Sequence, residues 1–195
     1  MHEHDQKQRF HALYQADYAR ILGYALRRTA CAEDAADVVA DVFTTAWRKF
    51  DEIPDGEEAV LWLYGVARRV LANQRRKAYG RGAVLELLAL DYEEAFLADP
   101  MPFTAGLSGA LREAWAALTA DDRDLLGLTV WETLSTEQIA LVAGCPRAVT
   151  KVRIHRARRR FARELHRRGY PLKPETLTRH IRPGRAGALP DTEAM

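Results

Sequence analysis

Apolar residues three and four positions apart recur along almost the whole chain, and this spacing constrains the fold more than any other feature. Residues at that spacing share one face of an α-helix, which turns once in about 3.6 residues. The segment 33–50, EDAADVVADVFTTAWRKF, is a clear example. Its apolar stripe consists of Val38, Val42, Phe43, Ala46, Trp47 and Phe50. No stretch alternates apolar and polar residues for long enough to predict a strand, so we expect an all-α fold.

Three helices are predicted in the N-terminal part of the chain. They span approximately residues 8–28, 33–50 and 58–78. Pro54 and Gly56 interrupt the pattern between the second and third helices, as expected of a loop. The polar residues before the first helix predict an unfolded terminus. The segment YGRG, residues 79–82, predicts the end of the third helix, because glycine weakens helices.

The chain is predicted to form two small helical domains joined by a linker. We interpret residues 1–78 as the first domain, 79–106 as the linker and 107–168 as the second domain. Residues 169–195 are rich in proline and glycine and contain few large apolar residues, which predicts a flexible C-terminal tail.

The composition excludes several classes of protein. With 48% hydrophobic and 29% charged residues, the chain has the make-up of an ordinary globular protein. Cys31 and Cys145 have no His or Cys at ligand spacing, so we expect no disulfide framework, metal or cofactor. The two isolated cysteines fit a protein of the reducing cytoplasm. No apolar run approaches the length of a membrane span, which predicts no signal peptide and no membrane insertion. No phosphate loop, HExxH motif or nucleophile elbow is present, so we predict no catalytic residue and no enzyme.

A helix-turn-helix is predicted in the second domain. Ser135 and Gln138 stand at the two positions of a capping box, which marks the start of a helix. Gly144 can adopt the left-handed conformation that ends a helix, and Pro146 is tolerated in the first turn of the next. Two helices joined by so short a turn form a helix-turn-helix, whose second helix normally lies in the major groove of DNA.

The second of these helices is strongly basic. Residues 147–168 contain ten Lys and Arg residues against Glu164 alone, although the whole chain has a net charge of only +2. Like charges at this spacing repel one another unless a polyanion neutralises them, which favours nucleic acid as the partner. A solvated basic helix without a partner is the alternative.

Two faces are predicted for this helix. Four apolar residues can seat it on the rest of the domain: Val149, Val152, Ala157 and Phe161. Four polar residues share another face: Arg147, Lys151, His155 and Arg158. We expect the polar face to meet phosphates and base edges.

A second basic cluster lies in the predicted third helix, in the segment 67–78, ARRVLANQRRKA, and Trp62 and Tyr64 precede it. Basic charge tracks a nucleic-acid backbone and aromatic rings stack on bases, so this combination favours single-stranded nucleic acid. The helical spacing of Trp62 is equally consistent with a position in the core.

Four segments together resemble one protein family. They are DAADVVADVFTTAWRKF, AVLWLYGVARRVLANQRR, LTADDRDLLGLTVWETLSTEQIA and GCPRAVTKVRIHRARRRF, in this order. From about Gln8 to Arg168, the chain resembles a bacterial RNA polymerase sigma factor of the extracytoplasmic-function (ECF) class. The resemblance implies that the first domain, region 2, binds core polymerase and opens the minus-ten element. The second domain, region 4, would read the minus-thirty-five element.

The resemblance also implies a polymerase-binding surface. The family pattern DVVQEVFLRAW falls on residues 37–47, and the implied core-binding residues are Asp37, Asp41, Thr44 and Trp47. Asp37 and Asp41 share one helix face, where they would meet basic residues of the polymerase clamp. A solvated acidic face is the alternative. The implied partners are promoter DNA and core RNA polymerase, through its largest and second-largest subunits, and an anti-sigma factor is a further candidate.

The minus-ten element would be bound by the loop before the third helix and by that helix. The loop 51–58 resembles the segment that captures a flipped base of the non-template strand. WLYGVARR matches the family's WLYRIARN, with Arg69 in place of the usual Asn. The implied minus-ten residues are Asp51, Trp62, Arg68, Arg69, Asn73 and Arg76.

The minus-thirty-five element would be read by the basic helix. The family's GCPEGTVKSRLSRAR becomes GCPRAVTKVRIHRAR, in which the Thr and Val at residues 149 and 150 have exchanged places. We expect three residues near bases: Lys151, Val152 and His155. We expect three others near phosphates: Arg147, Arg153 and Arg156. A simpler helix-turn-helix regulator, which binds DNA without being a polymerase subunit, is the competing function, but it explains only the C-terminal half.

Overall fold

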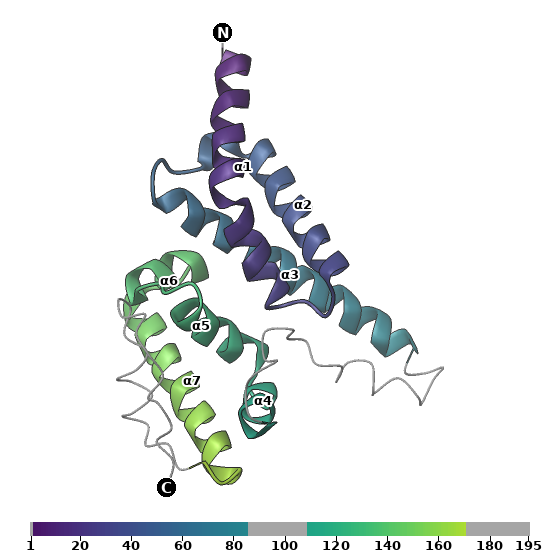
Figure 1. Cartoon of the computed structure of the whole chain (residues 1–195), viewed down its shortest axis with the longest axis vertical. Helices are drawn as coiled ribbons and strands as arrows, with labels where there is room; N and C mark the ends of the chain where they lie inside the picture. Colours follow the sequence, from purple (N-terminus) through teal and green to yellow (C-terminus); the bar gives the residue numbers. More distant parts are fainter. Residues whose placement is uncertain (1, 86–108, 171–195) are drawn as a thin grey trace, which may run out of the picture. The chain divides into compact units, whose positions relative to one another are not determined.

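The computed structural model describes residues 2–85 and 109–170 (Figure 1). All regular structure in these two stretches is helical, so the expected all-α fold is confirmed there. The elements are α1 (His2–Leu26), α2 (Ala32–Arg48), the short 3-10 helix η1 (Phe50–Glu52), α3 (Glu58–Leu85), α4 (Gly109–Ala116), α5 (Ala120–Val130), α6 (Thr136–Ala143) and α7 (Arg147–Arg167). Most of the expected linker, and the expected tail beyond residue 170, lie outside the described residues.

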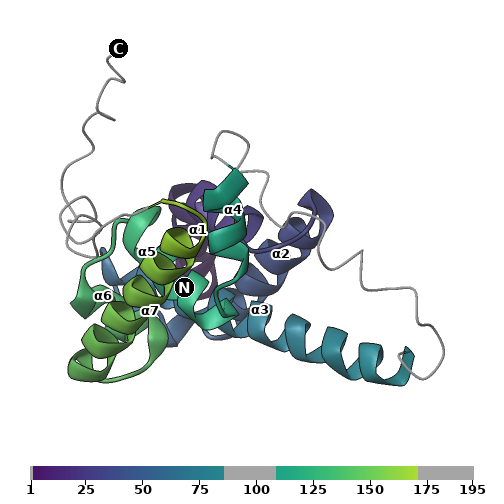
Figure 2. The ribbon, with the colours of Figure 1, turned by 90° about the horizontal axis from the view of Figure 1, so that it is seen from below.

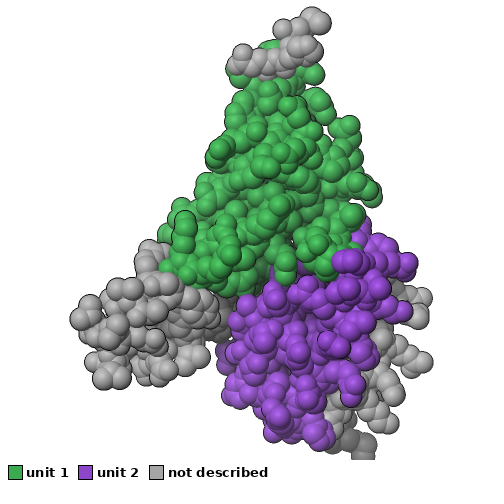
Figure 3. All heavy atoms as spheres, turned by 180° about the vertical axis from the view of Figure 1, so that it is seen from behind, with its two compact units in different colours: residues 1–107, 140–145 green, residues 108–139, 146–195 purple. Residues whose placement is uncertain are grey.

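The backbone forms two compact units (Figure 3). Of the described residues, 2–85 with 140–145 make the first unit, and 109–139 with 146–170 make the second. Helices α1, α2 and α3 belong to the first unit, α4, α5 and α7 belong to the second, and the partition divides α6. Two helical bodies agree with the predicted architecture.

In the first unit, α1, α2 and α3 pack pairwise around one apolar core. Its fully buried side chains include Ile21 and Tyr24 of α1, Val38 and Val42 of α2, and Leu63 of α3. Helix α2 buries one stripe of its surface, so its outer face remains accessible. Helix α3 is buried on nearly every side from Ala59 to Ala67, and its first exposed residue after Glu58 is Arg69.

Two helix ends differ from the prediction. Helix α1 begins at His2, so the residues expected to be unfolded are helical, and Gln8 Nε2 lies 3.0 Å from His4 Nε2 one turn away. Helix α3 continues to Leu85, so the YGRG segment does not end it, and its last turns extend beyond α2 (Figure 2). A glycine costs a helix only about 1 kcal/mol, and neither stretch contains a proline to force a break.

In the second unit, α7 packs against α4 and α5 (Figure 2). Leu118, Leu126 and Ala157 form a buried cluster, and Trp115 and Phe161 pack against it. The rings of Trp115 and Phe161 meet edge to face, with their centroids 5.7 Å apart. Aromatic pairs in this geometry stabilise a core beyond the area that they bury.

The predicted turn between α6 and α7 is confirmed in its main features. The backbone N–H of Gln138 donates to Oγ of Ser135 over 3.2 Å, and the N–H of Ser135 donates to Oε1 of Gln138 over 2.8 Å. Gly144 has φ of +60°, so it ends α6 in the left-handed conformation. Pro146 is the N-cap of α7, one position before the first helical turn.

The inner face of α7 differs from the prediction. Val149 and Val152, which were expected to seat the helix, are each 47% exposed. Thr150 is fully buried, and its hydroxyl donates to the carbonyl of Pro146 over 3.2 Å. A hydroxyl that bonds to its own helix can be buried without an unsatisfied group, which explains why a threonine stands here. The buried face consists of Thr150, Ile154, Ala157, Ala162 and Leu165.

This orientation of α7 predicts a contrast between two neighbouring substitutions. Ile154→Ala removes buried methyl groups and should lower the free energy of unfolding by about 2 to 4 kcal/mol. Val152→Ala removes exposed ones and should change it by less than about 0.5 kcal/mol. Urea unfolding followed by far-UV circular dichroism measures both. Equal costs for the two variants would mean that α7 is rotated about its axis.

Candidate polymerase and nucleic-acid interfaces

The outer face of α2 presents the residues predicted to bind the polymerase. Asp37, Asp41 and Thr44 are exposed at spacings of four and three residues, opposite the buried stripe of the helix. Trp47 is 38% exposed at the border of this face. The structure therefore brings all four onto one accessible surface.

Trp47 also belongs to an aromatic cluster between α1 and α2. The ring of Phe10 lies 5.1 Å from that of Trp47 and 6.3 Å from that of Phe43. Tyr14 lies 4.7 Å from Phe43 and is itself 39% exposed. The sequence analysis did not select Tyr14, although its spacing of four from Phe10 and from Tyr18 was an available signal. The accessible surface beside Trp47 thus extends onto α1.

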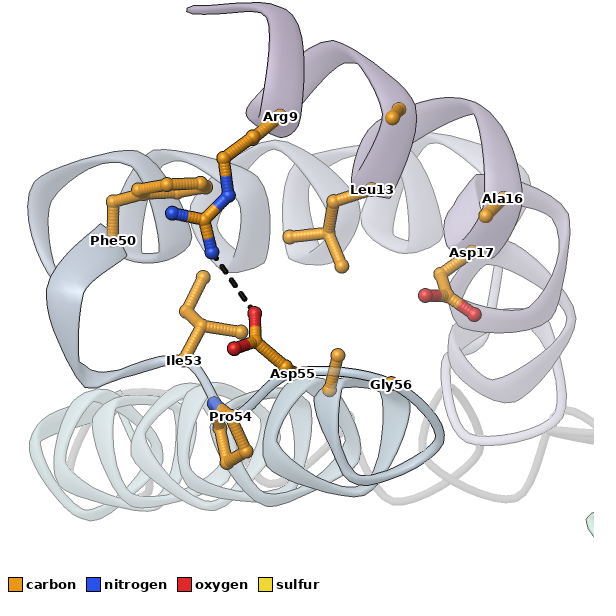
Figure 4. A pocket seen from close by; sticks show the side chains of 11 residues that line it. Arg9, Leu13, Ala16, Asp17, Phe50, Ile53, Pro54, Asp55 and Gly56 are labelled. Atoms are coloured by element: carbon orange, nitrogen blue, oxygen red, sulfur yellow. Dashed lines mark hydrogen bonds and ion pairs between the residues drawn. The ribbon is translucent and has the colours of Figure 1, made fainter. Parts of the chain in front are cut away.

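The loop before α3 is fastened to α1 (Figure 4). Nη2 of Arg9 lies 2.9 Å from Oδ1 of Asp55, and the guanidinium carbon lies 5.3 Å from the centre of the Phe50 ring. Gly56 has φ of +68°, a conformation that glycine adopts without strain, and it turns the chain into α3. Asp51, a predicted minus-ten residue, is exposed in η1. Sequence reasoning missed Arg9 because its partner is 46 residues away.

A cavity of about 270 Å³ lies between α1 and this loop. Its walls include Leu13 of α1 and Ile53 of the loop, and Asp17 lies at one end (Figure 4). Asp17 is buried and pairs with Arg20 over 3.2 Å, which neutralises its carboxylate. None of the six predicted minus-ten residues lines this cavity, although residues 53–56 of the loop expected to capture a flipped base do.

One stripe of α3 carries most of the predicted minus-ten residues. Trp62 is half-buried, and Arg69, Asn73 and Arg76 are exposed further along the same stripe. Nε of Arg69 donates to a backbone carbonyl one turn earlier over 3.0 Å, and Arg76 donates to Oδ1 of Asn73. Arg68 is half-buried and lies about 100° around the helix from Arg69, off this stripe.

The outer face of α7 presents four of the predicted minus-thirty-five residues. Lys151, Val152, His155 and Arg156 are all exposed. Val152 lies about 200° around the helix from the buried Thr150, so it points away from the core. The accessible side of the helix is therefore the side predicted to meet DNA.

The two remaining minus-thirty-five residues have acidic partners within the same unit. Arg147 forms an ion pair of 2.5 Å with Glu137 of α6. Arg153 is half-buried and lies 3.4 Å from Asp121 of α5. Both arginines differ in this respect from the residues of the outer face.

A stronger ion pair joins α7 to the first turn of α5. Asp122 is almost fully buried, and Nη1 of Arg160 donates to its two carboxylate oxygens over 2.9 and 2.7 Å. The backbone N–H of Asp122 also donates to Oγ1 of Thr119, the N-cap of α5, over 3.1 Å. The acidic start of α5 therefore neutralises one flank of the basic helix and holds it in register.

Arg158 was expected to share one face with Lys151, and its position seven residues further on does place it on the same side of the helix, but it is less exposed there. Its guanidinium is half-buried, and burial lowers its pKa below the usual value for arginine. Its Nε is buried and has no hydrogen-bond partner among the residues that the structure describes. Arg158 lies four residues from both Ile154 and Ala162, which are buried, so it borders the buried face of the helix.

Two features are absent from residues 2–85 and 109–170. No helix there is long and apolar enough to span a bilayer. No group of three or more His, Cys, Asp or Glu side chains in these stretches could hold a metal ion.

Comparison with known proteins identifies the class to which the two units belong. The family model for sigma-70 region 2 matches residues 13–81, and the model for sigma-70 region 4 matches residues 108–161. The chain is therefore a sigma-70-type factor that carries regions 2 and 4 in this order.

Two similar sigma factors show to which subgroup of sigma-70-type factors the chain belongs. The chain is 33% identical over 148 residues to the ECF RNA polymerase sigma factor SigL of Mycobacterium tuberculosis, covering 75% of this chain and 82% of the relative. It is 27% identical over 153 residues to the RNA polymerase sigma factor YlaC of Bacillus subtilis, covering 75% and 86%. The chain belongs to the ECF family of RNA polymerase sigma factors.

Solved structures support the fold. The chain is similar to the sigma factor RpoE of Bartonella quintana, solved with the anti-sigma factor NepR, with a TM-score of 0.58 and 24% identity over 83% of this chain and 97% of that one. It is also similar to CnrH, solved with the cytosolic domain of CnrY, with a TM-score of 0.56 and 22% identity over 83% and 90%.

The buried ion pair predicts a stability difference between two adjacent aspartates. Asp122→Ala leaves Arg160 without its partner and should lower the free energy of unfolding by about 1 to 3 kcal/mol. Asp121→Ala breaks a longer and more exposed pair and should cost less than about 1 kcal/mol. Urea unfolding of the full chain, followed by tryptophan fluorescence, compares them. A cost for Asp121→Ala as large as that for Asp122→Ala would contradict the assignment.

Proposed function

We propose that this ECF sigma factor divides promoter recognition between two surfaces. Residues 1–78 bind core polymerase and the minus-ten element, residues 107–168 bind the minus-thirty-five element, residues 79–106 link them and residues 169–195 form a tail. The observation that carries the proposal is the two-sided character of α7. This helix packs against α4 and α5, buries Ile154, and presents Lys151, His155 and Arg156 on the accessible side.

The outer face of α2 is the proposed polymerase contact. Asp37 and Asp41 form an exposed acidic pair, and Thr44 is exposed on the same face one turn further along. Trp47 supplies an aromatic side chain of the kind that contributes most of the binding energy in many interfaces. Acidic residues steer a basic partner and fix its register. The partner that we assign to this face is the clamp of the largest polymerase subunit, and further contacts involve the second-largest subunit.

The stripe on α3 and the loop before it are the proposed minus-ten surface. Arg69 and Arg76 can neutralise backbone phosphates, and the half-buried Trp62 can stack on a base from a fixed position. Arg68 adds positive charge from the flank of the stripe, and Asp51 belongs to the loop that would receive a flipped base.

The outer face of α7 is the proposed minus-thirty-five surface. Lys151, Val152 and His155 reach base edges, and Arg156 binds phosphate. Arg147 and Arg153 can also bind phosphate, but each must first leave its acidic partner, so we expect each to contribute less than Arg156.

Other features follow from this assignment. The chain acts as a binding subunit in the cytoplasm, where core polymerase works, and it catalyses no reaction itself. The solved structure of RpoE with the anti-sigma factor NepR supports an anti-sigma factor as a further partner of this chain. A simple helix-turn-helix regulator is the weaker alternative, because it gives no role to the region 2 match over residues 13–81.

The decisive experiment is transcription with purified components. Core polymerase with this chain should start RNA at specific sites in a genomic promoter library, whereas core polymerase alone should not. The free chain should bind the same promoters only weakly, because two small DNA-binding surfaces gain effective concentration once a partner fixes their spacing. Tight, specific binding by the free chain without any initiation would support the regulator instead.

The acidic face of α2 yields a prediction for polymerase binding. The variant Asp37→Lys with Asp41→Lys should bind core polymerase at least about tenfold more weakly, because reversed charges repel a basic partner. Its helical content should stay nearly unchanged, since exposed charges contribute little to folding. The control is Asp5→Lys, which reverses an exposed charge on α1. Fluorescence anisotropy with labelled chain measures both affinities, and normal assembly of the double variant would remove this face from the interface.

Phosphate contacts predict a change in salt dependence. Arg156→Ala should weaken holoenzyme binding to all promoters alike and reduce the slope of log affinity against log salt by about 1. Arg153→Ala should reduce the slope by less, because Asp121 already neutralises that arginine. Promoter binding at two salt concentrations gives both slopes. A change of base preference in the Arg156 variant would assign this residue to a base instead.

A further inference from the structure

The most outward part of α7 carries apolar side chains among basic ones. Val149 and Val152 are each 47% exposed, although the seat of the helix is complete without them. Lys151, His155 and Arg156 are exposed around them. A pair of valines exposed to this extent on the side of a helix opposite its core gives little packing energy to the fold, so its position needs another explanation.

The charges around the two valines select the kind of partner. A protein surface that covered this pair would have to bury or neutralise several cations, whereas duplex DNA neutralises them with its phosphates. The helix also follows a short turn, the arrangement that places the second helix in the major groove. The partner that fits both features is the major groove of DNA.

Thymine offers the matching apolar group. Among the base edges in the major groove, the C5-methyl of thymine is the apolar contact point, and the other groups are hydrogen-bond donors and acceptors. Valine is stiff at χ1, so it presents its methyl groups at a fixed position. Residues three apart on a helix are separated by about 4.5 Å along its axis. Base pairs follow one another every 3.4 Å, so two neighbouring pairs lie within reach.

We propose that Val149 and Val152 read thymine methyl groups at two neighbouring base pairs of the minus-thirty-five element. The inference rests on the proposed role of α7 and adds the chemical group that is recognised. Both positions are polar in the family pattern quoted above, Thr and Ser, and Val at both is a property of this chain. The structure thus explains both halves of the exchange of Val and Thr at residues 149 and 150. The buried Thr150 bonds to its own helix, and the exposed Val149 faces the groove.

The test removes the contact between valine and the thymine methyl group, first by changing the DNA and then by changing the protein. Reconstituted holoenzyme first selects duplexes from a library with a randomised minus-thirty-five segment. Each thymine of the selected duplex is then replaced by deoxyuridine, which lacks only the methyl group. Binding should fall about three- to tenfold at one or two neighbouring positions, the size expected for one buried methyl group. At these positions Val149→Ala or Val152→Ala should bind thymine and uracil duplexes equally.

Matched variants keep the test specific. Val152→Ile retains the apolar contact and should still distinguish thymine from uracil. Val130→Ala removes an exposed valine of α5, in the same unit, and should leave the discrimination unchanged. The inference is overturned if a duplex is selected but uracil binds as well as thymine at every position, or if the double alanine variant still discriminates. If the holoenzyme selects no duplex at all, the proposed function itself fails, and the inference fails with it.

Discussion

The burial of one face of α7 against α4 and α5 is the contact on which the rest of the second unit depends. Thr150, Ile154 and Ala157 fix the rotation of the helix, and the cluster of Leu118 and Leu126 receives it. Once this rotation is set, every other side chain of α7 has a defined direction. The same sequence turned by one residue would bury Lys151 and expose Thr150. The reading face is therefore a consequence of the core, and changes in the core should alter DNA recognition without touching DNA.

Charge is distributed in a way that supports this rotation. The acidic first turn of α5 neutralises Arg153 and Arg160 on one flank of α7, and the buried Asp122 fixes the second of these pairs. Lys151 and Arg156 lie on the accessible side, where repulsion among cations is relieved when a polyanion binds. In the first unit, negative and positive charges lie on different helices. The outer face of α2 carries Asp37 and Asp41, whereas the α3 stripe carries Arg69 and Arg76. One small chain can thus present surfaces to a basic protein and to DNA.

Sequence periodicity predicted the helices and the turn well, because both depend on local chemistry. The capping box of Ser135 and Gln138 and the left-handed Gly144 are contacts among near neighbours. The rotation of α7 was mispredicted for a physical reason. Val149 and Val152 were assigned inward by hydrophobicity, but a threonine whose hydroxyl bonds to its own backbone can occupy the seat. The contacts of Arg9 with Asp55 and of Arg160 with Asp122 join segments that are distant in the sequence, so no local sequence pattern predicts them. The residues proposed to touch polymerase and DNA came from the family resemblance, and the structure adds which of them are exposed.

Directed cleavage of promoter DNA tests the central claim that the side of α7 opposite its core meets the minus-thirty-five element. Cys31 and Cys145 are first replaced by Ser, and an iron chelate that generates hydroxyl radicals is attached to a cysteine introduced by Val152→Cys. A second protein carries the chelate after Glu113→Cys, on the exposed surface of α4. In the promoter complex with polymerase, the account predicts strong cleavage centred on the minus-thirty-five element from residue 152 and much weaker cleavage from residue 113. Cleavage of equal strength from both positions, or from residue 113 alone, would contradict it.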